Sequence, residues 1–262
     1  MKKIIEFIKN YWITALLFLG LYFLYVYLAN SENINNLLFP PVSQIISAFG
    51  EVNVTFLHNM MGSFGLMIPS LLIALIIALA LGTIMGLSPF CRRVLYPIIY
   101  TVSVVPSILL SPFALVLAPN FKMASIFLIA YNIIWPTLFA TINGIITIDR
   151  VYLDIADTLE IKGVKRLFKV LYPAAMPSIF SGLVTSIRGT FLVLVFAEMY
   201  GTQLGMGYFV KKYTDYGMYD YAWAGLIFMI LILLIVMLAF EKAKERTLRW
   251  TINDKRMFPI KI

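Results

Sequence analysis

Six long apolar runs, each free or nearly free of charged residues, alternate with polar segments along the chain. A hydrocarbon core of ~30 Å requires about 20 apolar residues in a helix, and every run comes close to that length or exceeds it. The pattern therefore predicts an all-α polytopic membrane protein, with a single transmembrane domain over residues 1–262 and six transmembrane helices. The predicted spans are residues 12–29, 60–87, 94–118, 123–147, 178–200 and 221–240.

Prolines interrupt two of the predicted spans. Pro106 and Pro112 fall inside the third span, and Pro136 falls inside the fourth. Because proline removes a helical hydrogen bond and clashes with the preceding turn, we expect kinks at these positions. In a transporter, such kinks can leave backbone carbonyls facing the cavity.

The first span also resembles a secretory signal peptide, because Lys2, Lys3 and Lys9 precede it. Its apolar run is, however, longer than the usual signal core of about 7–15 residues and contains several bulky aromatic residues. The sequence therefore favours a retained first helix.

The composition agrees with a membrane protein, since 61% of the residues are hydrophobic and only 13% are charged. Soluble proteins carry about 25% charged residues. These values exclude disorder, a collagen-like fibre and a disulfide scaffold, and they argue against an ordinary soluble enzyme. The net charge of +8 would suggest nucleic-acid binding in a soluble protein.

The placement of the positive charges offers a different explanation. Of the 21 Lys and Arg residues, 17 fall in segments on one predicted side of the membrane and three on the other, with Arg188 inside a span. An excess of Lys and Arg marks the cytoplasmic side, so we expect both termini in the cytoplasm and no nucleic-acid partner. The basic set is residues 1–10, 88–93, 149–177 and 241–262; the opposite set is 30–59, 119–122 and 201–220.

The residues that usually carry catalysis or bind metal are scarce. The chain has one cysteine, Cys91, and one histidine, His58, so neither an intrachain disulfide nor a Cys/His metal cluster can form. No GxxxxGK[ST] phosphate-binding loop is present. We expect Cys91 to be an inert small residue and His58 an interfacial polar residue rather than a ligand. The chain is thus predicted to be no enzyme and to bind no cofactor or metal.

Two ionisable residues, Arg188 and Glu198, lie within a predicted span. Ten positions separate them, which places them on different faces of a helix. Both are candidates for the transport pathway, where Arg188 would attract an anionic substrate. The structural alternatives are a hydrogen bond from Arg188 to carbonyls of a neighbouring span, near Pro106 or Pro112, and an interfacial carboxylate for Glu198.

The segment of residues 149–177 contains a predicted short amphipathic helix over residues 151–161. Apolar residues recur there at a spacing of four, at Val151, Ile155 and Leu159, with acidic residues on the other side. Gly163 can end this helix, and a second helical stretch over residues 165–171 is expected to stop at Pro173 and Pro177. Its own bundle, the lipid surface or a partner protein must cover the apolar stripe.

This segment resembles the EAA loop of bacterial ABC-importer inner-membrane permeases. Asp154, Ile155 and Ala156 take the places of the family's Glu-Ala-Ala triplet, and Tyr172-Pro173 takes the place of Leu-Pro. Glu160 stands at the usual glycine position, and the nearest glycine is Gly163. The coupling-loop residues that the resemblance implies are Asp154, Ile155, Ala156, Leu159, Glu160, Gly163 and Pro173.

The resemblance covers nearly the whole chain. The sequence Phe196-Ala197-Glu198-Met199, followed by Gly205-Met206-Gly207-Tyr208, is similar to the end of the fifth span in one branch of these permeases. That branch imports nitrate, sulfonates, taurine or bicarbonate and includes relatives for thiamine-precursor pyrimidines. Leu38-Phe39-Pro40-Pro41 and Leu248-Arg249-Trp250 also suit the branch. The resemblance implies the type I importer (MetI-like) permease fold.

The resemblance also implies a function and partners. The chain would be the permease subunit of an ATP-driven importer in the bacterial cytoplasmic membrane, passing a small solute such as a sulfonate or a thiamine-precursor pyrimidine. Cytoplasmic ATPase subunits would use ATP and Mg and receive the loop helix, with Ile155 and Leu159 as anchors and Ala156 allowing close approach. A second permease copy or homologue, an extracytoplasmic substrate-binding protein and membrane lipid complete the expected partners.

Two other functions compete with this one. A stand-alone ion-coupled secondary transporter would need inverted repeats and ligands for the coupling ion, and the sequence indicates neither. A membrane-embedded enzyme is disfavoured because nucleophile, metal and acid–base constellations are missing. On the non-cytoplasmic side, the tyrosines of residues 200–219 suit either an aromatic belt or contact with the binding protein.

Overall fold

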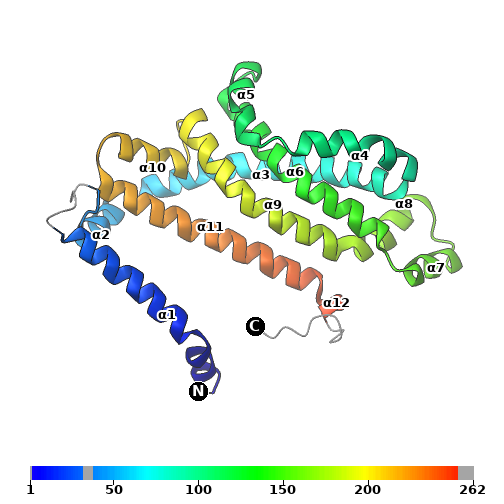
Figure 1. Cartoon of the computed structure of the whole chain (residues 1–262), viewed down its shortest axis with the longest axis horizontal. Helices are drawn as coiled ribbons and strands as arrows, with labels where there is room; N and C mark the ends of the chain where they lie inside the picture. The colour runs from blue at the N-terminus through cyan, green and yellow to red at the C-terminus, as the bar shows by residue number, and fades with distance from the viewer. Residues whose placement is uncertain (1, 32–37, 253–262) are drawn as a thin grey trace.

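The computed structural model describes residues 2–31 and 38–252. Within that part of the chain all regular secondary structure is helical, which confirms the all-α prediction. Helices α1, α3, α6, α9 and α11 are long; α2 and α10 lie at one end of the bundle and α7 and α8 at the other, whereas α4 runs beside α3 and α5 projects away (Figure 1). The elements are α1 (Lys2–Ala29), α2 (Val42–Glu51), α3 (Asn53–Leu87), α4 (Pro89–Ser103), η1 (Ser107–Leu110), α5 (Ser111–Leu117), α6 (Phe121–Ile146), α7 (Arg150–Thr158), α8 (Gly163–Arg166), η2 (Leu167–Leu171), α9 (Tyr172–Gly201), α10 (Met206–Asp215), α11 (Tyr219–Thr247) and α12 (Arg249–Ile252).

Five helices in the described residues are long and apolar enough to cross a membrane. A sixth candidate consists of α4 and the segment Ser107–Leu117, which meet at an angle of 79°. The predicted third span, residues 94–118, is therefore not one helix. The span boundaries in a membrane, and hence the six-span arrangement, remain predictions.

The break between α4 and η1 falls at Pro106, where a kink was expected. Pro106 adopts an extended conformation (φ −63°, ψ 132°) and has no N–H to continue the helix. Pro112 instead lies in the first turn of α5, where a missing N–H costs little because that turn has no intrahelical acceptor for it. Pro136 lies inside the continuous helix α6, and a kink there remains a prediction.

Helices α3, α6 and α9 form the centre of the bundle, with α6 packed against both neighbours. Glycines allow this close approach. A Cβ at Gly182 of α9 would lie 2.3 Å from the Cβ of Ala140, and one at Gly82 of α3 would lie 2.7 Å from the Cβ of Thr141. Small residues at helix crossings are the usual means by which membrane helices come close enough for backbone contact.

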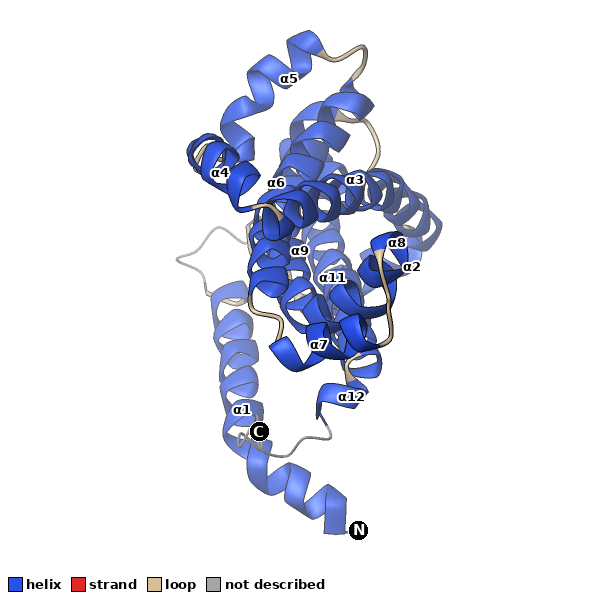
Figure 2. Ribbon diagram, turned by 90° about the vertical axis from the view of Figure 1, so that its right-hand side faces the viewer, coloured by secondary structure: helices blue, strands red, loops and turns tan. Residues whose placement is uncertain are grey.

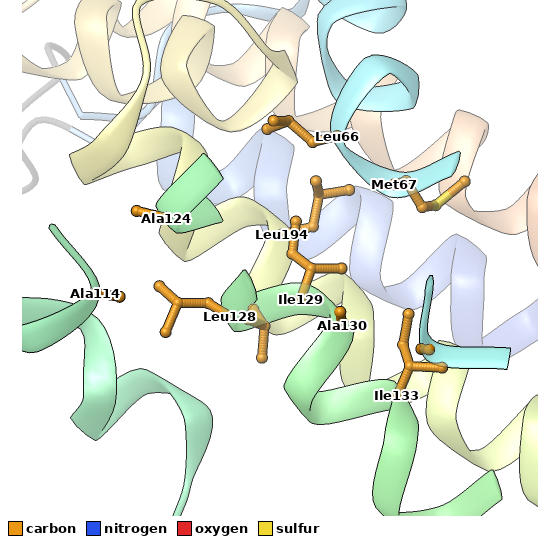
Figure 3. Close-up of a cluster of buried hydrophobic side chains, with 11 residues drawn as sticks. Leu66, Met67, Ala114, Ala124, Leu128, Ile129, Ala130, Ile133 and Leu194 are labelled. Carbon is orange, nitrogen blue, oxygen red and sulfur yellow. The ribbon is translucent and has the colours of Figure 1, made fainter. Parts of the chain in front are cut away.

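The largest group of buried apolar side chains lies between these central helices (Figure 3). Leu66 and Met67 come from α3, the run from Ala124 to Ile133 from α6, and Leu194 from α9, while Ala114 of α5 covers one side. Helix α5 is thus fixed to the bundle through α6, although it projects away from the other helices (Figure 1).

Helix α1 diverges from the rest of the bundle (Figures 1 and 2). Its anchor is near its C-terminal end, where the Tyr25 hydroxyl donates to the Pro40 carbonyl (2.8 Å) and the Tyr25 ring packs edge-on against Trp223. Large apolar side chains along α1, such as Leu17 and Phe18, are exposed. An apolar surface of this extent indicates contact with lipid or another chain.

Candidate functional site

Helix α7 opens the segment of residues 149–177, which we call the coupling loop. The Asp149 carboxylate accepts a hydrogen bond from the Val151 N–H (3.0 Å) and so caps the helix. Ile155 is 51% exposed and Leu159 64% exposed, and Val151 is also exposed. The structure thus confirms an amphipathic helix, although it ends at Thr158 and not at residue 161. Within the described residues its apolar stripe stays uncovered.

The C-terminal turn of α7 is built around Glu160. The Ile161 N–H donates to the Ala156 carbonyl (2.8 Å) and the Glu160 N–H to the Asp157 carbonyl (3.1 Å), which is the hydrogen-bond pattern of a Schellman motif. Glu160 occupies the left-handed region with φ 51°. The prediction that Gly163 ends the helix was wrong, because Glu160 supplies the left-handed residue three positions earlier.

This turn explains the glycine of the EAA pattern. Glycine reaches a positive φ without strain, whereas a residue with a Cβ pays about 1–2 kcal/mol. Glu160 keeps the turn and accepts that cost. Gly163 also has a positive φ, of 60°, at the start of α8.

Replacing Glu160 with glycine is expected to stabilise the folded chain by about 0.5–1 kcal/mol. The backbone strain energy relieved in the folded state exceeds the free energy by which glycine's extra conformational entropy favours the unfolded chain. Thermal unfolding of the detergent-purified protein measures this effect. Asp154→Gly is the matched control, since Asp154 is an exposed helical position of α7 where glycine costs about 1 kcal/mol. Equal destabilisation by both substitutions would contradict the proposed backbone strain at Glu160.

Ala156 does not play the part that the sequence suggested. Its side chain is fully buried within this chain, and α7 packs against η2. It therefore cannot allow close approach to a partner protein. An ion pair between Asp157 and Arg166 also holds α7 to α8, so the exposed stripe is presented by a helix that is fixed to the bundle.

The coupling loop continues without interruption into the bundle. The expected helix over residues 165–171 is present as α8 and the π-helical η2, but it stops neither at Pro173 nor at Pro177, which lies inside α9. Pro173 lies in the first turn of α9, where its missing N–H is tolerated. One continuous helix of 39 residues, Gly163–Gly201, therefore connects the coupling loop to the opposite end of the molecule.

At that opposite end, three side chains hold the turn between α9 and α10. Asn59 Oδ1 accepts from the Gly205 N–H (3.1 Å), Ser63 Oγ from the Met206 N–H (3.0 Å), and Glu198 Oε2 from the Gly207 N–H (2.7 Å). We call these three residues the turn clamp. They satisfy N–H groups at the start of α10, which have no acceptor within their own helix, and the carboxylate is also favoured by the helix dipole.

The interpretation of Glu198 as an interfacial carboxylate was wrong, because the side chain is completely buried. A Cβ at Gly205 would lie 2.4 Å from Glu198 Cδ, and Gly205 has φ 138°. A Cβ at Gly207 would lie 2.8 Å from the Val195 carbonyl oxygen. The Glu198…Gly205…Gly207 spacing in the sequence is therefore the mark of this contact.

Sequence reasoning missed the other two clamp residues, Asn59 and Ser63. They lie on α3, more than 140 positions before the turn that they bind. Their spacing of four on one helix, with Gly62 between them, is the one local signal. A Cβ at Gly62 would lie 2.6 Å from Leu204 Cγ, so α3 is closely fitted to this turn.

Arg188 lies in the middle of α9, and its side chain is 65% exposed. Its Nη2 donates to Glu241 Oε1 of α11 (3.1 Å). The predicted hydrogen bond to carbonyls near Pro106 or Pro112 was wrong, because the partner lies on another helix. A role of Arg188 in the transport pathway remains a prediction.

Exchanging the two charges separates these roles. Arg188→Gln is expected to destabilise the protein by about 0.6–1.7 kcal/mol, as for polar contacts between membrane helices, and Arg188→Glu combined with Glu241→Arg should restore the melting temperature. A structural pair predicts that transport recovers together with stability in the exchanged variant. Transport that stays lost although stability returns would instead assign Arg188 to the pathway.

A cavity of about 640 Å³ lies beside the turn clamp. His58 and Gly65 of α3, Lys122 near the start of α6, and the turn residues Thr202 and Gln203 contribute to its lining. It combines one positive charge with amide and hydroxyl groups. Among the described residues, no group of three or more His, Cys, Asp or Glu side chains is placed to hold a metal ion.

Helix α10, which follows the turn clamp along the chain, is rich in basic and aromatic residues. Lys211 donates to Asp215 (2.7 Å), and this hydrogen bond raises the pKa of the Lys211 ammonium. The same ammonium lies 5.6 Å from the centre of the Tyr200 ring, within cation–π range. An aromatic belt and a protein contact both remain predictions for these tyrosines.

Comparison with known proteins places the chain in a family. The model of the "Binding-protein-dependent transport system inner membrane component" family matches residues 77–247, which include the coupling loop and Glu198. The nitrate import permease protein NrtB of Leptolyngbya laminosa is 34% identical over 139 residues, covering 53% of this chain and 50% of that protein. The chain thus spans about half the length of such relatives in these matches.

Two further relatives match over more of their length. The putative aliphatic sulfonates transport permease protein SsuC of Bacillus subtilis (strain 168) is 26% identical over 174 residues, covering 66% of this chain and 63% of that protein. The taurine transport system permease protein TauC of Escherichia coli (strain K12) is 24% identical over 229 residues, covering 85% and 83%. The chain therefore belongs to the family of binding-protein-dependent transport system inner membrane components, as an ABC-transporter permease of the branch that holds these relatives.

Proposed function

We propose that this chain is the transmembrane subunit of an ATP-driven importer and that its coupling loop is the docking site of a separate ATPase subunit. The observation that carries the proposal is the exposed apolar stripe of Ile155 and Leu159 on α7. None of the described residues covers this stripe, which lies outside the predicted spans, and this favours a partner protein, since an amphipathic helix commonly lies in a groove of another protein. ATP and Mg would be bound by that subunit and not by this chain.

The continuous helix Gly163–Gly201 supplies the mechanical connection. The ATPase subunit would push on α7, which Ala156 and the Asp157–Arg166 ion pair hold to the start of that helix. The helix ends at the turn clamp, so a rigid-body rotation would displace both ends together. Rigid-body motions of this kind switch many proteins between two discrete packings. Inward-open and outward-open states would then differ in the position of the turn between α9 and α10.

The substrate proposed is a small solute, with an anion such as a sulfonate as the first candidate and a thiamine-precursor pyrimidine as the second. The cavity beside the turn clamp supports an anion, because Lys122 lines it and no acidic residue does so among the described residues. A substrate-binding protein would deliver the solute at this end, on the outer side. A second permease copy or homologue would complete the passage.

The orientation follows from the basic segments. The coupling loop and the two termini carry most of the Lys and Arg residues, and the positive side of a membrane protein faces the cytoplasm. We therefore place the coupling loop and both termini in the cytoplasm and the turn clamp on the outer side of the bacterial cytoplasmic membrane.

Co-expression of this chain with candidate ATPase and binding-protein subunits of an ABC importer tests the proposal. We expect a stable complex whose ATPase activity in nanodiscs rises when the binding protein carries its solute. Sulfonates, taurine, nitrate and pyrimidines are then compared as solutes for that stimulation. Failure of the co-expressed ATPase subunit to associate with the folded chain would contradict the proposal.

A further inference from the structure

A second cavity, of about 690 Å³, lies beneath the coupling loop. The ends of α3 and α6 and the start of α4 form one side of it, and α7, α8 and η2 form the other. These elements lie together at one end of the molecule (Figure 1). Apolar side chains such as Leu87, Ile146 and Leu167 make up most of the lining.

Two arginines, Arg92 of α4 and Arg166 of α8, are the charged groups of this lining, and no acidic residue contributes to it among the described residues. Arg92 Nη1 donates to the carbonyls of Met85 (3.2 Å) and Gly86 (3.3 Å) at the end of α3. Arg166 pairs with Asp157, which is not part of the lining. A guanidinium carries five N–H donors, so both arginines keep donors for a further acceptor.

We propose that this cavity binds the headgroup of an anionic phospholipid from the cytoplasmic leaflet. Guanidinium groups recognise phosphate oxygens in a planar, bidentate geometry, and basic pockets between helices on the cytoplasmic side are suited to anionic headgroups. A free phosphate ion would gain nothing from the apolar walls, whereas the glycerol and acyl parts of a lipid can cover them. The inference rests on the orientation given under the proposed function.

The position of the cavity gives the lipid a mechanical role. Its walls belong both to the bundle, through α3, α4 and α6, and to the coupling loop, through α7 and α8. A bound headgroup would therefore brace the loop against the ends of the spans. The phosphate would lie between the two guanidinium groups and draw α8 toward α4.

Lipid binding to the detergent-purified full chain tests the proposal directly. Native mass spectrometry would follow titrations with phosphatidylglycerol and with phosphatidylcholine, and we expect preferential retention of phosphatidylglycerol. Arg92→Gln and Arg166→Gln should each weaken that binding about fivefold, since a basic residue near anionic lipid contributes about 1 kcal/mol. Arg93→Gln is the matched control, because Arg93 is the exposed neighbour of Arg92 and does not line the cavity.

Asp157→Asn separates lipid binding from the ion pair. It removes the partner of Arg166 but leaves the guanidinium in the cavity wall, so phosphatidylglycerol binding should be kept or become tighter. Loss of binding equal to that of Arg166→Gln would show that the ion pair alone matters. Equal retention of both lipids, or displacement of phosphatidylglycerol by millimolar inorganic phosphate, would also overturn the proposal.

The same lipid titration on the assembled complex tests whether the cavity still binds lipid when the ATPase subunit is present. We expect the phosphatidylglycerol to stay bound when the ATPase subunit is present, and its expulsion by that subunit would overturn the proposal. Binding is measured without transport, so failure of the ATP-driven function would leave this result unchanged. Conversely, an importer that works but binds no anionic lipid here would reject this inference alone.

Discussion

Replacing Leu159 with aspartate is expected to abolish co-purification of the ATPase subunit while the permease stays folded. Leu159 is an exposed residue at the end of α7 and is not among the buried core residues of the described part of the chain. In the proposed complex it enters an apolar groove, where a carboxylate would lose its hydration without a partner. Loss of a central anchor costs about 2 kcal/mol or more, which is roughly a thirtyfold fall in affinity. Affinity pull-down of the co-expressed subunits measures it.

Thr158→Asp is the control for this experiment. Thr158 is the exposed neighbour of Leu159 and lies outside the apolar stripe, so the same added charge should leave the complex intact. Ala156→Asp would be a poor test of docking, because Ala156 is buried and its replacement would disrupt the loop itself. An intact complex in the Leu159→Asp variant would show that α7 is not the docking site of the ATPase.

Replacing Gly205 with alanine is expected to cause the largest loss of stability of any single methyl addition at the turn clamp. The added Cβ would lie 2.4 Å from Glu198 Cδ, and φ of 138° is accessible essentially to glycine alone. The backbone would have to move, which would break the bonds to Asn59, Ser63 and Glu198. We expect a cost of about 3 kcal/mol or more, because buried N–H groups would lose their acceptors. Thermal unfolding measures the loss.

Gly65→Ala is the matched control, since no heavy atom beyond the neighbouring residues and backbone of its own helix lies within 4 Å of a Cβ at that position of α3. There the helix should be unchanged or slightly stabilised. Combining Gly205→Ala with Glu198→Ala should cost less than the sum of the two single changes, because the second substitution removes the atoms in conflict. Strict additivity, or a normal melting temperature for Gly205→Ala, would contradict the geometry of the clamp.

Local patterns were sufficient to predict the long helices α1, α3, α6, α9 and α11 and the amphipathic α7, because hydrophobic periodicity and charge placement act within a few turns. They did not predict the break that divides the third span. They also singled out Glu198 and the glycines after it, through the resemblance of that segment to a known branch. Local patterns could not predict contacts between segments that are far apart in the sequence. Nothing near Asn59 indicates that its side chain binds a backbone N–H 146 positions later.

The errors have physical causes that single positions illustrate. Gly163 was expected to end α7, but a Schellman turn with Glu160 at positive φ ends it earlier. Pro173 was expected to stop a helix, yet it falls in the first turn of α9, directly after a π-helical segment. Ala156 was assigned to a partner contact, but it is buried within its own chain. The sequence could not distinguish the two, because a small residue suits close packing against either.

Uptake into proteoliposomes tests most directly whether ATP hydrolysis by a partner subunit drives transport through this chain. This chain, the co-purified ATPase subunit and the binding protein would be reconstituted together, and entry of labelled solute would be followed with and without ATP. We expect uptake that requires ATP and the loaded binding protein and that persists when ionophores collapse all ion gradients. Uptake by this chain alone, driven by an ion gradient and abolished by the ionophores, would contradict the proposed function and identify a secondary transporter.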